Sequence, residues 1–302
     1  MTRYIATTGF FDGVHKGHVA VLERLKKVGG DLNLPVCVVT FWPHPRIVLN
    51  DDSDKLKLLS SVKEKKQYIE SLGIHRVIVI PFTEKFSNIS PKQFIVEELV
   101  EKYDIAGLCI GYDHHIGKNR EGGFELIKEI CNETGLYCER IPPLMIGDKI
   151  ISSQKIRKYL LEGNVEEANF MLNYSYSLTG VVIHGQKLGG TIGFPTANIK
   201  VENDLKLIPA EGVYAVKVKI ENCPKHLSGM LYIGKKAAAN DPNKIFIEVN
   251  IFDFNDDLYG KQISVSFEYF VRKNMQFGNI REMKTQLTTD RQIVHELLSL
   301  NP

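Results

Sequence analysis

Several features that would at once assign a class of protein are missing from this sequence. No apolar run approaches the ~20 residues that a membrane-spanning helix needs. Asp12 and its neighbouring glycines lie where a secretory signal peptide would need an apolar core. Internal repeats and low-complexity segments are also missing. These absences predict a cytoplasmic protein with no membrane partner.

An excess of charge of one sign is also lacking. The sequence has 38 Lys and Arg against 36 Asp and Glu, a formal net charge of +2, so no nucleic-acid partner is expected. The densest basic group, Lys63-Glu64-Lys65-Lys66, is interpreted as the solvated face of a helix. The five cysteines form no Cys-x-x-Cys pair, which predicts reduced, mostly buried thiols. We expect a soluble enzyme for small molecules, a monomer or weak oligomer.

The 302 residues are enough for two domains. The first half alternates short apolar segments with helical patterns, which predicts a parallel α/β sheet covered on both faces, with ligands at the carboxyl ends of its strands. The expected strands are 3–8, 35–41, 76–81 and 107–111. The expected helices are 17–28, 61–72, 91–102 and 121–134, and helices at 152–162 and 165–172 would close this domain.

After residues 174–177 the pattern changes to closely spaced strands, which predicts a small antiparallel β-barrel or sandwich. The expected strands are 177–184, 212–220, 228–234, 245–254 and 262–271. A C-terminal amphipathic helix should pack on them through Ile280, Met283, Leu287, Val294, Leu297 and Leu298. We therefore predict domains at 1–173 and 174–302.

The segment from Gly9 to His18 follows the first strand and opens a helix. A helix N-terminus offers unpaired N–H groups and the positive end of its dipole, and glycines allow a ligand to approach the backbone. His15 and His18 fall on one helix face, where two imidazoles can donate to phosphate oxygens. Lys16 could add a charge. The alternatives are a glycine turn with two surface histidines, or a zinc site that lacks a nearby third ligand.

This segment resembles the signature of the HxGH nucleotidyltransferases, which transfer a nucleotidyl group from ATP and release pyrophosphate. Within them, the chain resembles the FAD synthetase module of bacterial bifunctional riboflavin kinase/FAD synthetases. Three further motifs carry that resemblance in order: Phe41-Trp42-Pro43-His44-Pro45-Arg46, Gly111-Tyr112-Asp113-His114-His115-Ile116-Gly117-Lys118-Asn119-Arg120-Glu121-Gly122, and Ile151-Ser152-Ser153-Gln154-Lys155-Ile156-Arg157.

The resemblance implies roles for single residues. His15 and His18 would contact the ATP phosphates in the transition state. The nucleotide would also be bound by Gly9, Phe10, Asp12, Gly17, Ser152, Ser153 and Arg157. Hydroxyls and a guanidinium at a helix start suit phosphate, although Ser-Ser before a helix is also a common N-cap. The flavin would be bound by His44, Asp113 and Arg120. The family has Thr at the position of Gln154.

The second half resembles the riboflavin kinase module of the same family. The matching motifs are Gly180-Val181-Val182-Ile183-His184-Gly185, Gly193-Phe194-Pro195-Thr196-Ala197-Asn198-Ile199, Gly212-Val213-Tyr214-Ala215, Ile247-Glu248-Val249-Asn250-Ile251-Phe252-Asp253-Phe254 and Asp257-Leu258-Tyr259-Gly260. The resemblance implies that Gly193, Thr196 and Asn198 bind Mg²⁺-ATP, with Thr196 and Asn198 on the metal. It also implies that Glu248 is the general base for the ribityl hydroxyl and that Arg272 binds flavin.

The kinase half departs from the family pattern at several positions. The differing residues are Gly190, Tyr232, Lys236, Ala237, Ala238, Asn250 and Asn274. Lost contacts with Arg and Thr would weaken nucleotide or flavin binding, at about 1.5–3 kcal/mol for a charge-assisted hydrogen bond. Lys187 or Lys236 could compensate. The adenylyltransferase half is the better supported assignment.

The leading hypothesis is a bifunctional enzyme that uses ATP and Mg²⁺ to convert riboflavin to FMN and then FMN to FAD. A second hypothesis is an FMN adenylyltransferase whose barrel only binds flavin, as a scaffold or sensor. A third gives the first domain another acceptor, such as phosphopantetheine or a nicotinate nucleotide, but the attached kinase-like half argues against it.

Overall fold

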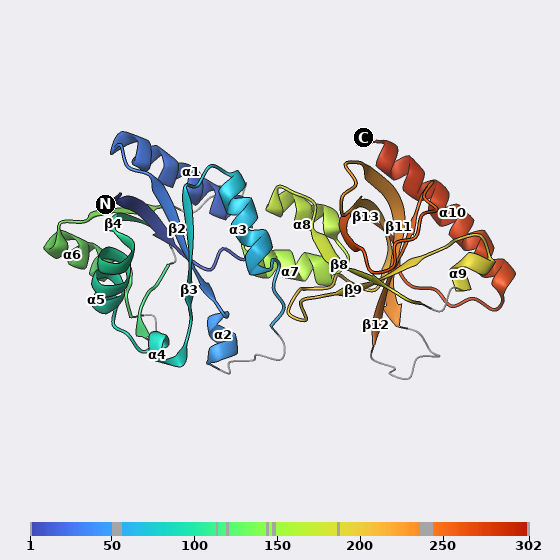
Figure 1. Ribbon diagram of the computed structural model, residues 1–302, viewed down its shortest axis with the longest axis horizontal. Coiled ribbons are helices and arrows are strands. Elements are labelled where there is room, and N and C mark those ends of the chain that lie inside the picture. The colour runs from blue at the N-terminus through green and yellow to red at the C-terminus, as the bar shows by residue number, and fades with distance from the viewer. Residues whose placement is uncertain are drawn as a thin grey trace. The chain divides into compact units, whose positions relative to one another are not determined.

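The computed structural model describes residues 2–49, 56–112, 114–118, 121–142, 145, 146, 149–185, 188–235 and 244–300. Packing divides the chain into two compact units, Met1–Ser153 and Gln154–Pro302, each described by itself below (Figure 1). No helix among these residues is long and apolar enough to cross a membrane. All five cysteines are free thiols, and Cys37, Cys109 and Cys131 are buried.

The first unit is built on a parallel sheet with the strand order β3-β2-β1-β4-β5. Its strands are β1 (Tyr4–Thr8), β2 (Val36–Trp42), β3 (Arg76–Pro81), β4 (Ile105–Gly111) and β5 (Tyr137–Ile141). The predicted α/β class is confirmed. The sequence did not predict β5, an edge strand whose central Cys-Glu-Arg lacks the apolar continuity of the other strands. Because β1 lies between β2 and β4, the turn after β1 and the segment after β4 leave the same edge side by side.

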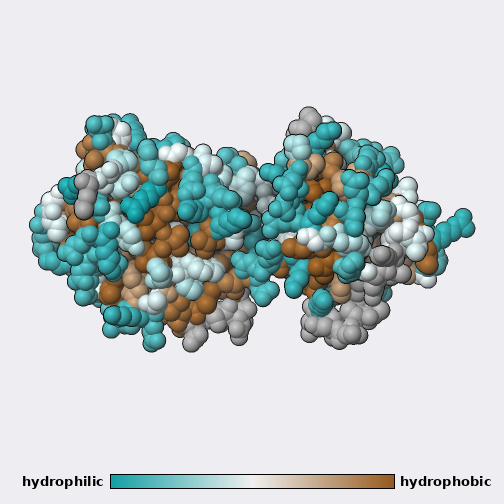
Figure 2. Space-filling model, viewed as in Figure 1, coloured by the Kyte–Doolittle hydropathy of each residue, from teal (hydrophilic) through white to brown (hydrophobic). Residues whose placement is uncertain are grey.

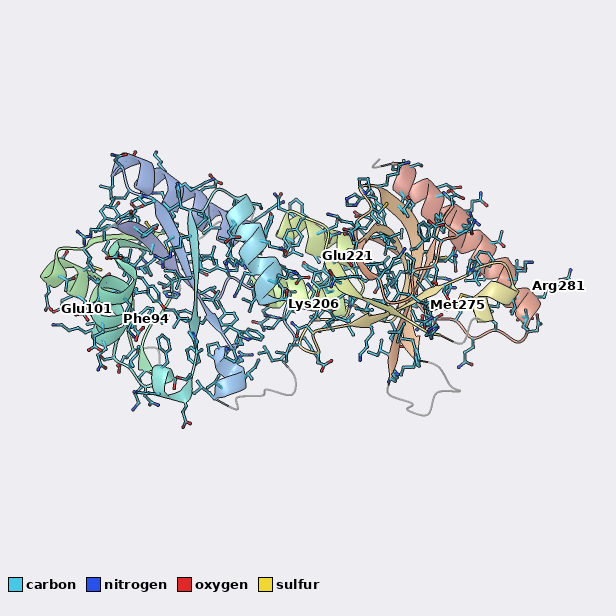
Figure 3. All side chains as sticks on the ribbon, viewed as in Figure 1. Phe94, Glu101, Lys206, Glu221, Met275 and Arg281 are labelled. Atoms are coloured by element: carbon cyan, nitrogen blue, oxygen red, sulfur yellow. The ribbon has the colours of Figure 1, made fainter. Side chains whose placement is uncertain are left out.

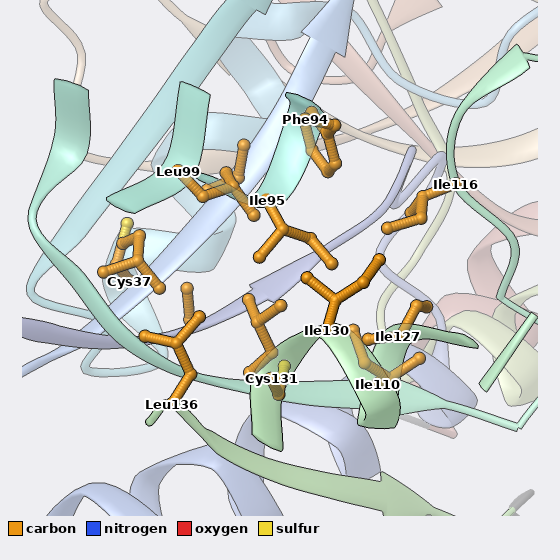
Figure 4. Packing of buried hydrophobic residues seen from close by; sticks show 14 of the residues in the cluster. Cys37, Phe94, Ile95, Leu99, Ile110, Ile116, Ile127, Ile130, Cys131 and Leu136 are labelled. Carbon is orange, nitrogen blue, oxygen red and sulfur yellow. The ribbon is translucent and has the colours of Figure 1, made fainter. Parts of the chain in front are cut away.

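Helices cover both faces of this sheet. On one face α1 and α3 contribute Leu22, Leu25 and Ile69 to a cluster with Ile5 and Val38. On the other face the π-helix η2 and α6 pack around the strands, as Figure 4 shows. The helices are α1 (Lys16–Asp31), α2 (Pro45–Val48), α3 (Val62–Ser71), α4 (Glu84–Ser87), α5 (Pro91–Gln93), η2 (Phe94–Glu101) and α6 (Phe124–Thr134), and β6 (Met145–Ile146) pairs with β7 (Lys149–Ile150).

The helix predicted at 91–102 begins as α5 and continues as η2, whose ends Phe94 and Glu101 are labelled in Figure 3. Pro91 at its start packs against the segment after β4: a Cβ placed on Gly117 would lie 2.6 Å from Pro91 Cδ. Gly117 also has a φ of +75°, where glycine is favoured. The element therefore fixes the positions of Gly117 and Gly122 as well as covering the sheet.

The second unit is a closed antiparallel barrel with the order β10-β11-β12-β9-β8-β13. Its strands are β8 (Ser177–Ile183), β9 (Ala197–Val201), β10 (Gly212–Ile220), β11 (His226–Lys235), β12 (Ile245–Ile251) and β13 (Gln262–Arg272), with α9 (Leu188–Thr191) before β9. The predicted barrel is confirmed. The sequence did not predict β9, because Thr196-Ala197-Asn198 follows Gly193 and Pro195, which indicate a turn.

The C-terminal helix α10 (Ile280–Ser299) packs on the outside of the barrel. Val294 and Leu298 are buried with Met230 and Phe252, and Met283 and Leu287 are partly buried there, while hydrophilic residues line the outer side of the helix in Figure 2. Ile280, predicted to face the barrel, is instead 68% exposed. It is the first helical residue after the N-cap Asn279, where the periodic pattern continues but the barrel surface does not.

Helices α7 (Ser153–Leu161) and α8 (Val165–Leu172) lie between the two predicted domains in sequence. The side chain of Asn169 donates to the Phe267 carbonyl and accepts from the Tyr176 N–H, both at 2.7 Å, and Ala210 N–H donates to the Leu160 carbonyl. These contacts join both helices to the barrel. The packing boundary, between Ser153 and Gln154, therefore lies at the start of α7, whereas the boundary predicted at 173/174 follows both helices.

Candidate active sites

The turn after β1 has an unusual backbone. Phe11 and Val14 have φ values of +50° and +38°, and Gly13 lies at +77°. A left-handed conformation costs a residue with a Cβ about 1–2 kcal/mol, and most for a β-branched one. Phe11 and Val14 are nonetheless 4% and 1% exposed. The surroundings must therefore hold this turn in place.

Hydrogen bonds to Leu59 and Ser60, in the segment before α3, stabilise this turn. The buried carboxylate of Asp12 accepts hydrogen bonds from the backbone N–H groups of Leu59 and Ser60, at 3.0 and 3.1 Å. In return, the Gly13 N–H donates to the Ser60 hydroxyl. Ser153 Oγ donates to the Asp12 carbonyl at 3.0 Å. Asp12, predicted to bind nucleotide, thus directs its carboxylate at the protein backbone and supports the turn.

Lys65 also holds the turn in place. Its position shows that the interpretation of 63–66 as a solvated helix face is wrong for this residue. Lys63 and Lys66 are exposed, but Lys65 is 3% exposed and extends inward from α3. Its Nζ donates to the Phe10 carbonyl at 2.7 Å and to Thr40 Oγ1 at 2.8 Å. Burial lowers the pKa of this ammonium to about 8, although Asp12 opposes the shift.

His15 and His18 meet as predicted from their spacing. The two rings stack with centroids 3.7 Å apart and planes 13° from parallel. His15 caps α1 by accepting the His18 N–H on Nδ1, at 3.4 Å, so a neutral His15 carries its proton on Nε2. A Cβ on Gly17 would lie 3.2 Å from the His15 ring, which explains the glycine there.

His18 is kept neutral by its surroundings. Burial, His15 and Lys65, in that order, lower its pKa well below the usual value. Its Nδ1 is buried and finds no hydrogen-bond partner within the described part of the chain. The imidazole therefore has unused hydrogen-bonding capacity at the start of α1.

Backbone donors complete an anion site. Neither the Phe10 nor the Phe11 N–H donates to any group among the described residues. These donors lie in the turn that leads into the first turn of α1, where His15 and His18 stack. Unpaired N–H groups beside a helix N-terminus bind phosphate oxygens well.

Other predicted residues of the first unit lie near this turn. The His44 ring lies 4.0 Å from the Phe10 ring, and His44 caps α2 by accepting the Arg46 N–H. Thr8 Oγ1 and His114 Nε2 are 2.7 Å apart, which links the ends of β1 and β4. Asp113 and Arg120 lie outside the described residues. Arg157 lies on α7 in the second unit, which begins at Gln154, so its role and that of Ser152 stay predictions.

The second candidate site lies on neighbouring barrel strands. Glu248 on β12 is the register partner of Asn198 on β9, and cross-strand partners share one face of a sheet. The neighbouring Asn250 donates its amide to the Pro195 carbonyl at 2.6 Å. Asn250 thus holds the segment that begins at Gly193, whose φ of +88° favours glycine. A cavity of about 270 Å³ extends from this segment and is lined by Val182, Pro195–Ala197, Val249, Ile251 and Phe254–Tyr259.

Arg272, predicted to bind flavin, forms a bidentate ion pair with Asp290 of α10. Nε lies 2.9 Å and Nη2 2.7 Å from the carboxylate, which is fully buried and also accepts from Gln286. Nη1 donates to the Lys273 carbonyl. The helix therefore sets the orientation of this guanidinium.

Among the positions that depart from the family pattern, Tyr232 lies beside Glu248 on the neighbouring strand. Tyr232 is the β11 register partner of Glu248, and burial, Glu211 and Glu248 raise the pKa of its hydroxyl. Asn274 donates to Glu211 and to the Ile233 carbonyl, and its Oδ1 is buried without a partner in the described part of the chain. Gly190 lies within α9, and a Cβ placed on it would meet nothing within 4 Å. Lys187, Lys236, Ala237 and Ala238 lie outside the described residues.

Sequence reasoning missed Lys65, Thr40 and the Leu59-Ser60 segment as supports of the first site. One signal was available: at helical spacing, Lys65 falls on the buried face of α3 with Ile69, which is fully buried.

Comparisons with known proteins match each half of the chain to a family. A family model for FAD synthetase matches residues 1–155, and one for riboflavin kinase matches 172–298. The bifunctional riboflavin kinase/FMN adenylyltransferase of Listeria monocytogenes is 38% identical over 95% of this chain and 90% of its own. That of Bacillus subtilis is 36% identical with the same coverage, and that of Escherichia coli is 33% identical over 98% and 93%.

Among solved structures, one described as a macrolide-efflux protein from Streptococcus pneumoniae superposes with a TM-score of 0.89. It is 28% identical and covers 97% of this chain and 94% of its own. Together with the two family models and the identities over nearly the full length, these matches show that the chain belongs to the bifunctional riboflavin kinase/FMN adenylyltransferase family.

Proposed function

We propose that the two halves catalyse consecutive reactions at the two sites described above. The barrel phosphorylates riboflavin with ATP to give FMN and ADP, and the first unit transfers AMP from ATP to FMN to give FAD and pyrophosphate. The observation that carries the proposal is the stacked His15–His18 pair at the start of α1, which follows a turn where the N–H groups of Phe10 and Phe11 have no acceptor among the described residues.

In the adenylyl transfer, an oxygen of the FMN phosphate attacks the α-phosphorus of ATP while the bond to pyrophosphate breaks. His15 Nε2 and the imidazole of His18 donate to the phosphate oxygens as charge builds on them. Ser152, Ser153 and Arg157 are assigned to the leaving pyrophosphate, by their residue types. His44, Asp113 and Arg120 are assigned to the flavin, and the contact of the His44 ring with the Phe10 ring of the turn supports the first of these.

In the kinase reaction, Glu248 accepts the proton of the ribityl 5′-hydroxyl as this oxygen attacks the γ-phosphorus. Asn198 on β9 is the register partner of Glu248 on β12, and Thr196 directly precedes β9. The Thr196 hydroxyl and the Asn198 amide oxygen are hard oxygen donors of the kind that fit Mg²⁺. When bound, Mg²⁺ neutralises charge on the nucleotide phosphates. The cavity beside Thr196 is assigned to the nucleotide and the held guanidinium of Arg272 to the flavin.

The proposal places the enzyme in the cytoplasm, where its five cysteines would stay reduced, and requires no partner beyond its small-molecule substrates. The domain boundary at 173/174 is retained as the division between the two activities.

Chromatography of products tests the function directly. Riboflavin with Mg²⁺-ATP should give FMN and then FAD, and FMN with Mg²⁺-ATP should give FAD and pyrophosphate. FAD from FMN but no FMN from riboflavin would leave the barrel as a flavin-binding scaffold. Failure to make FAD from FMN, with another acceptor adenylylated, would refute the assigned first activity.

A further inference from the structure

The burial of Lys65 is not needed to build α3. The helix has its own capping box between Ser61 and Glu64, and it packs through Ile69. A buried ammonium is unfavourable unless it is paired, and an apolar side chain of similar length would fill the same space without that penalty. A buried cation beside a phosphate-binding turn therefore points to a function at that turn.

The hydrogen bonds of Lys65 show what it controls. Nζ donates to the Phe10 carbonyl and to Thr40 Oγ1, and the Thr40 hydroxyl donates to the same carbonyl at 3.3 Å. In a trans peptide the C=O and the following N–H point in opposite directions. Holding the Phe10 carbonyl toward Lys65 therefore aims the Phe11 N–H away from it. This N–H has no acceptor within the described residues.

The charged and titratable groups around Lys65 are few. Asp12 from the turn interacts favourably with the ammonium, and its carboxylate already accepts from Leu59 and Ser60. From α1, His18 is close enough for Lys65 to disfavour its protonation. Strand β2 contributes the neutral Thr40 hydroxyl, and α3 itself contributes Glu64, whose carboxylate is bonded to the Ser61 N–H.

We propose that Lys65 is a positioning residue of the adenylyltransferase site, which orients the Phe10–Phe11 peptide so that its N–H faces the phosphates and places a positive charge beneath them. The inference rests on the proposed function of the first unit. Lys65 acts through the turn, because Phe10 and Phe11 lie between it and the anion site. Lys65 therefore does not contact substrate.

The test compares Lys65→Met, Lys65→Arg and the control Lys63→Met, which changes an exposed lysine of the same helix. kcat/KM for FAD formation from FMN and for FMN formation from riboflavin is measured from pH 6.5 to 9.5 in each protein. The fluorescence of Trp42, the sole tryptophan, reports whether the first unit is folded.

We expect Lys65→Met to lower kcat/KM for FAD formation by about 10²-fold, the scale for losing one preorganised donor, and to leave FMN formation unchanged. In the wild type, kcat/KM for FAD formation should fall above about pH 8, as Lys65 loses its proton. Lys65→Arg should retain more activity than Lys65→Met and should remove this alkaline decline. Lys63→Met should match the wild type.

Two results would overturn the inference while leaving the proposed function standing. One is a folded Lys65→Met that makes FAD at the wild-type rate. The other is a wild-type profile for FAD formation that stays flat to pH 9.5, or that declines identically in Lys65→Arg. If Lys65→Met fails to fold, the wild-type profile still decides. A wild type that makes no FAD from FMN overturns the proposed function and the inference together.

Discussion

The two candidate phosphate sites of this chain are held in place in different ways. The turn at Gly9–Val14 is fixed by buried charged side chains, Asp12 and Lys65, that reach segments distant in sequence. The segment at Gly193–Asn198 is fixed by strand pairing and by the neutral amide of Asn250. A site between parallel strands lies in loops and needs such supports, whereas a barrel positions side chains through its register.

This comparison has a consequence for mutagenesis. Substitutions in the first site should disturb its backbone as well as its chemistry. Those in the second should act more locally, because the strands keep their register. The activity of each half also serves as an internal control for variants of the other.

The largest effect is expected for Glu248→Gln. The amide keeps the shape of the side chain but removes its basicity, so the rate of FMN formation should fall ~10²–10⁴-fold. FAD formation from FMN should not change. The measurement is FMN production at saturating Mg²⁺-ATP. Equal rates in wild type and variant would show that Glu248 is not the base.

Thr196→Ala, by contrast, should raise the Mg²⁺-ATP concentration that the kinase reaction requires.

His18→Ala and His15→Ala should each lower the rate of FAD formation ~10²–10³-fold, because each removes a donor to the phosphates in the transition state. Riboflavin phosphorylation should be spared. The rates are measured with FMN and ATP as substrates. FAD formation near the wild-type rate in both variants would contradict the role assigned to the stacked pair.

Asp290→Ala should destabilise the barrel by about 3 kcal/mol, the lower end for breaking a buried ion pair, since it leaves Arg272 without its carboxylate. Because α10 orients Arg272, KM for riboflavin should rise as well. Calorimetric unfolding and kinase kinetics measure the two effects. A lowered stability with an unchanged KM would show that Arg272 does not bind flavin. The control is Asp253→Ala, which removes an exposed partner of Arg291.

The fragments 154–302 and 174–302 test the position of the boundary. Both should unfold cooperatively, but 174–302 lacks both hydrogen bonds of Asn169 to the barrel and should be less stable by ~2 kcal/mol, at ~1 kcal/mol for each bond. Thermal unfolding of the two fragments gives the difference. Equal stabilities would favour the boundary at 173/174.

The smallest effect concerns acid stability of the first unit. The pKa of His18 is lowered in the fold, so the unfolded chain binds the proton more readily. Stability is therefore complete above the ordinary pKa of 6.5 and is lost as the pH falls below it, by about 1.4 kcal/mol per pH unit. Trp42 fluorescence should show this loss in the wild type between pH 7.5 and 5.5. A loss of the same size in His18→Gln would assign it to other groups.

Much of this architecture could be read from the sequence. Continuous apolar strands alternating with helices predicted the parallel sheet, and closely spaced strands predicted the barrel. The elements missed are those whose local pattern is weak: the edge strand β5, with charged residues at its centre, and β9, whose start follows glycine and proline. Ile280 is an error of the opposite kind: its place in the helical pattern predicted that it packs on the barrel, but its side chain is exposed.

For the sites, the sequence determined which groups are available, because residue type sets what His15, His18, Thr196 and Glu248 can donate or accept, and their roles stay predictions. Only the tertiary structure decided which charged residues are buried. Lys63, Lys65 and Lys66 are the same residue type on one helix, but of the three only Lys65 reaches the turn. Helical spacing directs its side chain inward, where Nζ donates to the Phe10 carbonyl just after β1. Burial and pairing depend on what packs against a residue, and that is set by segments far away in the chain.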